Sequence, residues 1–165
     1  MRINMKPAVV ISLSETKVEV IRKFDSSVES VWKPFTNTSL VSQWMLGPPG
    51  WSMPICEIDF RIGGIYRNVF RNEVEGLEID ITGAFRKIAT HQKIVQDEQH
   101  KIGSSKGGIT KSTVVTLTFE PVGESTNVRT LIEYGSKKER DEALATGMGD
   151  AMEMGYCRID ELLSN

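Results

Sequence analysis

The chain has 165 residues, of which 39% are apolar, 25% are charged and 7% are aromatic. This average composition excludes collagen-like, intrinsically disordered and disulfide-rich proteins, and the length is enough for one domain with a substantial core. The formal net charge of -2 supplies no basic surface field, so we predict that nucleic acid is not a partner.

Cysteine usage and the start of the chain bear on the compartment. Cys56 and Cys157 lie far apart and form no Cys-x-x-Cys motif, so we expect neither a disulfide framework nor a redox pair. The apolar stretch from Ala8 to Ile11 is too short for a signal peptide, and no segment approaches the roughly 20 apolar residues of a membrane span. We therefore predict a protein of the reducing cytoplasm without a membrane span.

The first predicted elements are a strand and two short helices. Apolar and polar residues alternate over 17–24, which is the period of a half-buried strand. Residues 1–16 form an N-terminal extension that can add another strand, because apolar residues also alternate from Val9 to Leu13. Capping residues at 25–27 and 37–39 each precede apolar residues at helical spacing, so two short helices should follow.

Strand patterns then dominate as far as about residue 134. Turn residues interrupt them at Gly63-Gly64, at 72–76, at 103–108 and at 123–126, which predicts an antiparallel meander. We expect 97–112 to be a polar, glycine-rich loop.

The last element is predicted to be one long helix from about Glu139 to Leu163. Its apolar residues recur at helical spacing and are the only available cover for one face of the sheet. The predicted fold is therefore α+β, with a curved antiparallel sheet wrapped around a long C-terminal helix and two short helices after the first strand. A ligand cavity would form between sheet and helix.

Several segments together resemble a known family. They are Val20-Ile21-Arg22-Lys23-Phe24-Asp25, Val31-Trp32-Lys33-Pro34-Phe35-Thr36, Trp44, Asp59-Phe60-Arg61-Ile62-Gly63-Gly64, Gly83-Ala84-Phe85, Val115-Thr116-Leu117-Thr118-Phe119-Glu120, and residues 155–163. From about 17 to 163 the chain is similar to the START-like (SRPBCC) superfamily, and within it to bacterial relatives of the activator of the heat-shock chaperone ATPase, the Aha type.

The resemblance implies a single START-like domain over 1–165, with a helix-grip fold like that of the birch pollen allergen and a hydrophobic cavity. Most members of the family have no assigned reaction, so the resemblance identifies no ligand. The chain also departs from the family pattern. Gly155-Tyr156-Cys157 replaces an aromatic position of many relatives, and Met148, Met152 and Met154 make the last helix rich in methionine.

Candidate binding residues are the aromatic and methionine side chains that could line this cavity. A stripe of methionine packs on the sheet and can equally wall a cavity, because methionine is flexible and polarizable. Buried tyrosine and tryptophan also offer one polar group each at a rim. The predicted ligand-binding residues are Trp44, Trp51, Tyr66, Phe85, Leu117, Tyr134, Met148, Met152 and Tyr156.

Asp59 and Arg61 are the most prominent charged pair. Two residues apart on a predicted strand, they would share one face and form an ion pair before the Gly63-Gly64 turn. We interpret the pair as structural, with a charged gate at the cavity as the alternative.

The leading functional hypothesis is a non-enzymatic module that binds a small, largely apolar molecule, without cofactor or metal. Ser105 lies in a Gly-x-Ser-x-Gly sequence, but both histidines precede it, so we predict no nucleophile there. A cyclase- or hydrolase-like enzyme that uses Asp59 or Tyr66 as acid or base is one alternative. A protein-interaction module in contact with a chaperone is another, and a homodimer is compatible with all three.

Overall fold

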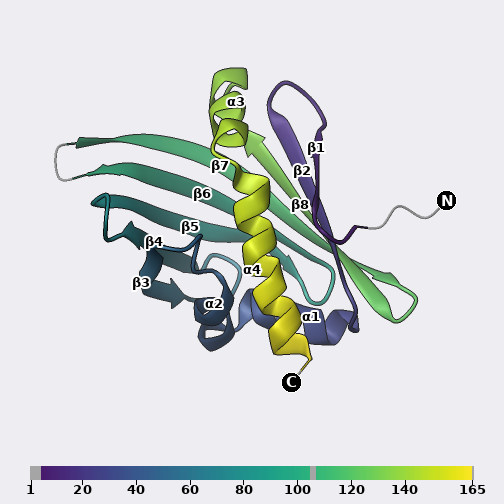
Figure 1. Ribbon diagram of the computed structural model, residues 1–165. Coiled ribbons are helices and arrows are strands. Elements are labelled where there is room, and N and C mark those ends of the chain that lie inside the picture. Colours follow the sequence, from purple (N-terminus) through teal and green to yellow (C-terminus); the bar gives the residue numbers. More distant parts are fainter. Residues whose placement is uncertain (1–4, 105–106, 165) are drawn as a thin grey trace.

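The computed structural model describes residues 5–104 and 107–164 and has one antiparallel sheet with helices on one of its faces (Figure 1). The strands are β1 (Val9–Ser12), β2 (Lys17–Phe24), β3 (Trp51–Ile58), β4 (Ile65–Asn72), β5 (Leu77–Ala89), β6 (Lys93–Ser104), β7 (Gly107–Val122) and β8 (Ser125–Tyr134). The helices are α1 (Val28–Thr36), α2 (Thr38–Trp44), α3 (Lys137–Ala145) and α4 (Met148–Leu163). The strand order is β1-β2-β8-β7-β6-β5-β4-β3.

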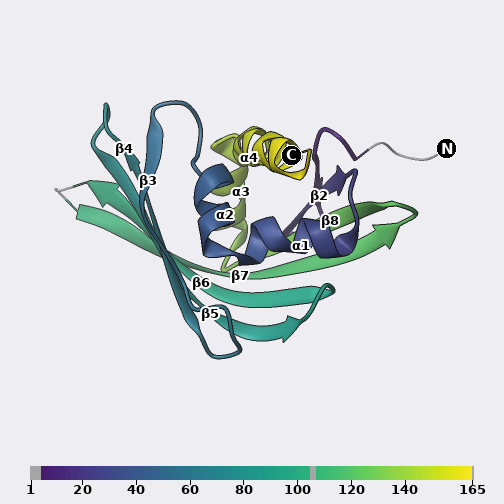
Figure 2. The ribbon, with the colours of Figure 1, turned by 90° about the horizontal axis from the view of Figure 1, so that it is seen from below.

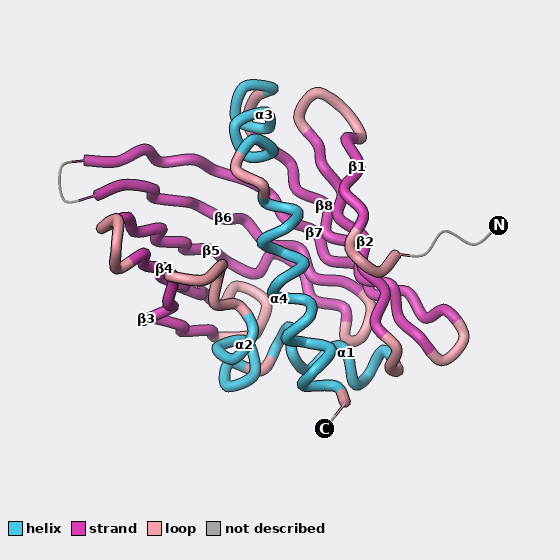
Figure 3. The backbone as a smooth tube through the Cα atoms, viewed as in Figure 1, coloured by secondary structure: helices cyan, strands magenta, loops and turns pink. Residues whose placement is uncertain are grey.

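All the helices lie on what we call the inner face of the sheet, and the opposite side is the outer face. Seen from below, the sheet curves beneath α1, α2 and α4 (Figure 2). The smooth trace shows α4 running across the strands towards α1 and α2 (Figure 3). This arrangement confirms the predicted α+β helix-grip fold.

The two short helices form where the capping residues predict them. The Ser27 hydroxyl accepts a hydrogen bond from the Ser30 N–H at the start of α1, and the Asn37 side chain accepts one from the Ser39 N–H at the start of α2. The Trp44 indole N–H donates to the Pro34 carbonyl at 2.7 Å and so joins the two helices.

The predicted single helix from Glu139 is wrong, because the segment forms two helices. Gly147 separates them with a φ of 76°, a left-handed conformation that glycine adopts without the steric penalty of other residues. The apolar stripe of α4 therefore begins at Met148.

The predicted loop over 97–112 is also wrong. β6 and β7 pair continuously from Lys93↔Thr118 to Ser104↔Gly107, and Ser105 and Lys106 lie outside the described residues. The polar residues of this segment alternate between the two faces of a long hairpin, and several of its residues are β-branched, which suits a strand. Polarity alone therefore did not indicate a loop.

The apolar core lies between the inner face and α1, α2 and α4. Trp32 of α1 packs edge-on against Phe119 of β7, with ring centroids 4.9 Å apart. Tyr156 of α4 packs edge-on against Phe24 of β2, and Ile159 on the same helix is fully buried. Aromatic pairs of this geometry add to the stabilisation from burial.

Arg22 is a buried cation inside this assembly. It lies on β2, is 1% exposed, and donates to Glu153 at 2.9 Å and to Asp160 at 2.8 Å, both on α4. The Glu153 carboxylate also accepts the Ala8 N–H at 2.8 Å. Burial acts to raise the pKa of Glu153, but the hydrogen bonds from Arg22 and Ala8 outweigh it, so the pKa is lowered. The cluster therefore joins α4, β2 and the N-terminal segment.

We expect Arg22→Met to destabilise the protein by about 3 to 5 kcal/mol, because it removes the buried cation shared by two partly buried carboxylates. Among the ion pairs of the described residues, Asp160 then keeps only its contact with Lys6 at 3.4 Å. Denaturant unfolding measures the change. Arg61→Met is the matched control: Arg61 and Asp59 are 73% and 53% exposed, and an exposed pair contributes about 1 kcal/mol or less. Equal effects of the two substitutions would contradict the role given to Arg22.

Candidate functional site

A group of polar side chains lies on the inner face of β4, β6 and β7. Because side chains alternate along a strand, the inner-face residues of neighbouring strands line up in rows across the sheet. One row joins Tyr66, Gly83, Glu98, Thr113 and Tyr134 through successive strand pairs. We call the following residues the polar cluster: Tyr66, Asn68, Gln96, Glu98, His100 and Thr113.

Glu98 is the centre of the polar cluster. Its carboxylate accepts a hydrogen bond from the Tyr66 hydroxyl at 2.5 Å and one from the Gln96 amide at 3.2 Å. The His100 Nε2 lies 3.2 Å from the other carboxylate oxygen and 3.4 Å from the Thr113 hydroxyl. The side chains of Glu98 and His100 are 15% and 26% exposed, so the carboxylate is held mainly by protein partners in a site that solvent still reaches.

Gly83 makes the bond between Tyr66 and Glu98 possible. The three residues lie on consecutive strands, with Gly83 in the middle. A Cβ at Gly83 would lie 2.2 Å from the Tyr66 ring, a distance that side chains do not tolerate. The missing side chain therefore lets the ring lie across β5 and reach the carboxylate on β6.

Burial and the Glu98 charge set the ionisation of the nearby phenols. Burial, followed by the charge of Glu98, raises the pKa of Tyr66 far above its ordinary value. The same two causes raise the pKa of Tyr134 to about 12. Tyr66 is therefore a neutral hydrogen-bond donor to the Glu98 carboxylate.

Five of the predicted binding residues lie at the apolar border of the polar cluster or next to it. Phe85 pairs with Gln96, its ring lies 5.1 Å from that of Tyr66, and the Tyr134 hydroxyl donates to the Met148 sulfur at 3.3 Å. These five residues are Phe85, Leu117, Tyr134, Met148 and Met152, and all except Phe85 are only partly buried. Tyr66, a sixth predicted residue, is buried within the polar cluster itself.

The remaining predicted residues lie elsewhere. Trp44 and Tyr156 stack on each other in the core, with ring centroids 6.3 Å apart. Trp51 begins β3 at the edge of the sheet. Asp59 and Arg61 form an ion pair of 2.7 Å, but they follow β3 in a turn instead of lying on a strand, and both are exposed. Asp59 is therefore not a buried carboxyl.

Sequence reasoning missed most of the polar cluster. Gln96, Glu98 and His100 alternate on β6 between the apolar residues Ile94 and Ile102, which is the pattern of a strand with a polar inner face. Assigning 97–112 to a loop hid this alternation.

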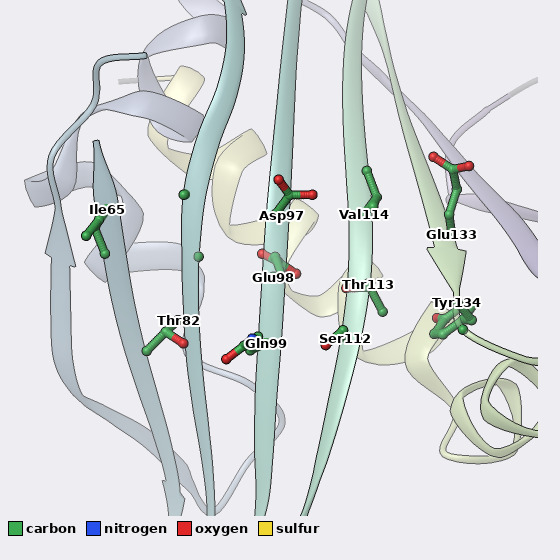
Figure 4. Close-up of a pocket in the computed structure, with 13 residues that line it drawn as sticks. Ile65, Thr82, Asp97, Glu98, Gln99, Ser112, Thr113, Val114, Glu133 and Tyr134 are labelled. Atoms are coloured by element: carbon green, nitrogen blue, oxygen red, sulfur yellow. The ribbon is translucent and has the colours of Figure 1, made fainter. Parts of the chain in front are cut away.

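A groove of about 550 Å³ lies on the outer face, and its lining includes Glu98 and Thr113, whose strands also carry the polar cluster (Figure 4). In this view α4 lies behind the strands, and the labelled side chains come from β4 to β8. The side chains on the outer face that line the groove are Ile65, Thr82, Ala84, Asp97, Gln99, Ser112, Val114 and Glu133.

Within residues 5–104 and 107–164, no group of three or more His, Cys, Asp or Glu side chains is placed to hold a metal ion. No helix in the described part of the chain is long and apolar enough to cross a membrane.

Comparison with known proteins gives a family and a set of similar folds. The family model "Activator of Hsp90 ATPase homolog 1-like protein" matches residues 25–164. A structure from Rhodobacter sphaeroides is 26% identical, with 95% of this chain and 97% of that chain covered and a TM-score of 0.81. One from Nitrosomonas europaea is 18% identical, with 93% and 97% covered and a TM-score of 0.77. Comparison with curated proteins gave no match.

We expect Gly83→Ala to destabilise the protein by about 1 to 3 kcal/mol, because the new methyl group displaces the Tyr66 ring and breaks its bond to Glu98. Thermal or denaturant unfolding measures the loss. Gly135→Ala is the control, since the atom nearest to its new Cβ is the end of the flexible Glu139 side chain. A stability equal to that of the wild type would show that Tyr66 is not held against Gly83.

The three tyrosines should ionise only at unusually high pH. At about pH 10, where free tyrosine is half ionised, we expect almost no phenolate absorbance from the folded protein. Burial, the first cause in each case, raises the pKa of all three tyrosines, to about 12 for Tyr134 and Tyr156. Because the unfolded chain releases these protons first, stability is full below pH 10 and falls as the pH rises towards the folded-state values. A full phenolate signal near pH 10 with the fold intact would contradict this.

Proposed function

The chain belongs to the Activator of Hsp90 ATPase homolog 1-like family, and from this premise we propose that it binds a small, largely apolar molecule on the inner face of its sheet, beside α4. The observation that carries the proposal is the polar cluster, which lies among apolar side chains. Small-molecule sites have this composition, with mostly apolar walls and a few polar groups that orient the ligand.

If the polar cluster were only part of the core, it would cost folding free energy that apolar side chains would not. Buried polar groups stabilise a fold only when hydrogen-bonded, and apolar side chains of similar volume are often as good or better. Glu98 is supplied with donors from Tyr66 and Gln96, so the protein maintains a charged group where packing does not need one. Binding of a ligand would account for a charged group at this position.

The apolar walls of the proposed site are suited to ligands of more than one shape. Leu117, Met148 and Met152 are only partly buried although they pack against the core. Methionine adapts to irregular surfaces because its side chain is unbranched and polarizable. We therefore expect the site to select apolar ligands by their size and to accept ligands of different shapes.

Acid–base catalysis is a second candidate function, favoured by the hydrogen-bonded series Tyr66, Glu98 and His100. A carboxylate between a phenol and an imidazole can accept a proton from a bound molecule and return it. Asp59 has no part in this, since it is exposed in a turn. The two functions differ in whether the bound molecule leaves unchanged, which mass spectrometry of the recovered ligand would show.

A protein-interaction function would use the other side of the sheet. The outer-face groove has apolar side chains from Ile65, Ala84 and Val114, and Ile65 is 67% exposed. A chaperone contact at this groove would fit the family's description and the cytoplasmic location predicted from the sequence. It would leave the inner face free for a ligand.

Methyl NMR of protein labelled at its methionine methyl groups tests the proposed site. Titration with aromatic compounds, isoprenoids and long-chain alcohols should shift the signals of Met148 and Met152. Met154 is on the same helix but 42% exposed, so its signal should stay in place. A ligand at one hundred times its dissociation constant should also stabilise the fold by about 2.7 kcal/mol, visible as a rise in melting temperature.

Replacing each methionine in turn by leucine assigns the signals. If no compound moved Met148 or Met152, or if Met154 moved as much as they do, the inner-face site would be wrong.

A further inference from the structure

Asn68 carries an acceptor without a partner inside the polar cluster. The residue is 6% exposed, and its Oδ1 atom has no hydrogen-bond partner among the described residues. Buried polar atoms are almost always hydrogen-bonded, so an unpaired oxygen needs an explanation. One explanation is that a bound molecule supplies the missing donor.

The surroundings of Asn68 fit this explanation. Its cross-strand neighbours are Cys56 on β3 and Ile81 on β5, and Ile81 pairs in turn with His100 on β6. All three neighbours are only partly buried. A buried acceptor thus lies in a row of side chains that are not fully enclosed.

The charges of the inner face exclude one large class of ligand. The described strands place two cations on this face, Arg22 and Lys111, and each is matched by a carboxylate of a helix. Lys111 bonds Glu142 of α3 at 2.5 Å. The polar cluster adds the Glu98 carboxylate, so the strands offer acceptors and a negative charge, and both of their cations are already paired.

We propose, on the basis of the function proposed above, that the ligand carries a hydrogen-bond donor such as a hydroxyl, amine or amide N–H, which Asn68 Oδ1 accepts, and that the ligand is not an organic anion. The apolar body of the ligand lies against Ile81 and the side chains of α4. Asn68 thereby distinguishes donor-bearing molecules from ethers and carboxylates of the same size.

Three probes of one shape test the inference: 2-naphthol, its methyl ether and naphthalene-2-carboxylate. Isothermal titration calorimetry at neutral pH should give 2-naphthol a dissociation constant about tenfold lower than that of the ether, which is the effect of one well-made hydrogen bond. The carboxylate should bind most weakly of the three.

Asn68→Leu should remove the preference by bringing 2-naphthol to the affinity of the ether. Thr130→Val is the control, because Thr130 is also a buried polar residue of the inner face, but it lies on β8, where its hydroxyl interacts with Tyr156 of α4. This variant should keep the preference of the wild type. Without ligand, Asn68→Leu should melt at or above the wild-type temperature, since it removes an unpaired acceptor.

The outcomes separate the two proposals. Equal affinity of the wild type for 2-naphthol and the ether, a preference that survives Asn68→Leu, or a large fall in melting temperature of that variant would each overturn the role of Asn68 while leaving the apolar site intact. Failure of all three probes to bind at near-millimolar concentration would count against the proposed function itself.

Discussion

The buried ion pairs of Arg22 determine how α4 sits on the sheet. Glu153 and Asp160 lie seven residues apart, so both point from one side of the helix, and Arg22 holds both. Fixing that side also fixes the neighbouring side, where Met148 and Met152 begin the stripe that faces the sheet. A buried cation is a poor source of net stability but tolerates little change in geometry. The position of the proposed ligand site relative to α4 therefore depends on a charge outside that site.

Strong periodic patterns made much of the fold predictable. The strand over 17–24 and the two capped helices follow from alternation and from the residues at 27 and 37. Apart from the polar segment 97–112, the features that these patterns missed depend on single positions. Gly147 ends α3 in a left-handed conformation, and His91, with a φ of 62°, forms a turn that contains no glycine or proline. Each of these breaks depends on the backbone conformation of one residue. A periodic pattern, which extends over a whole helical turn or strand, does not detect such a residue.

The candidate site was less predictable because its contacts cross strands. Tyr66 and Glu98 are 32 residues apart in sequence, and their bond depends on the register of three strands and on the absence of a side chain at Gly83. Sequence reasoning selected Tyr66 as an aromatic residue, yet it had no means of identifying its partner. It selected Asp59 for its charge, and the structure places that charge in solvent. Residue type indicated candidates, whereas register decided which of them meet.

The polar cluster conflicts with the rest of the sequence in a consistent way. Elsewhere on the inner face, many apolar side chains meet the helices, and the cations Arg22 and Lys111 are each paired with a helix carboxylate. In the polar cluster, a carboxylate takes an apolar position, a strand carries a glycine, and Asn68 has an unpaired oxygen. Each feature is a local cost, and local rules are expected to fail where function requires it. Three such costs within two adjacent rows of side chains support the proposal that this part of the sheet recognises a ligand.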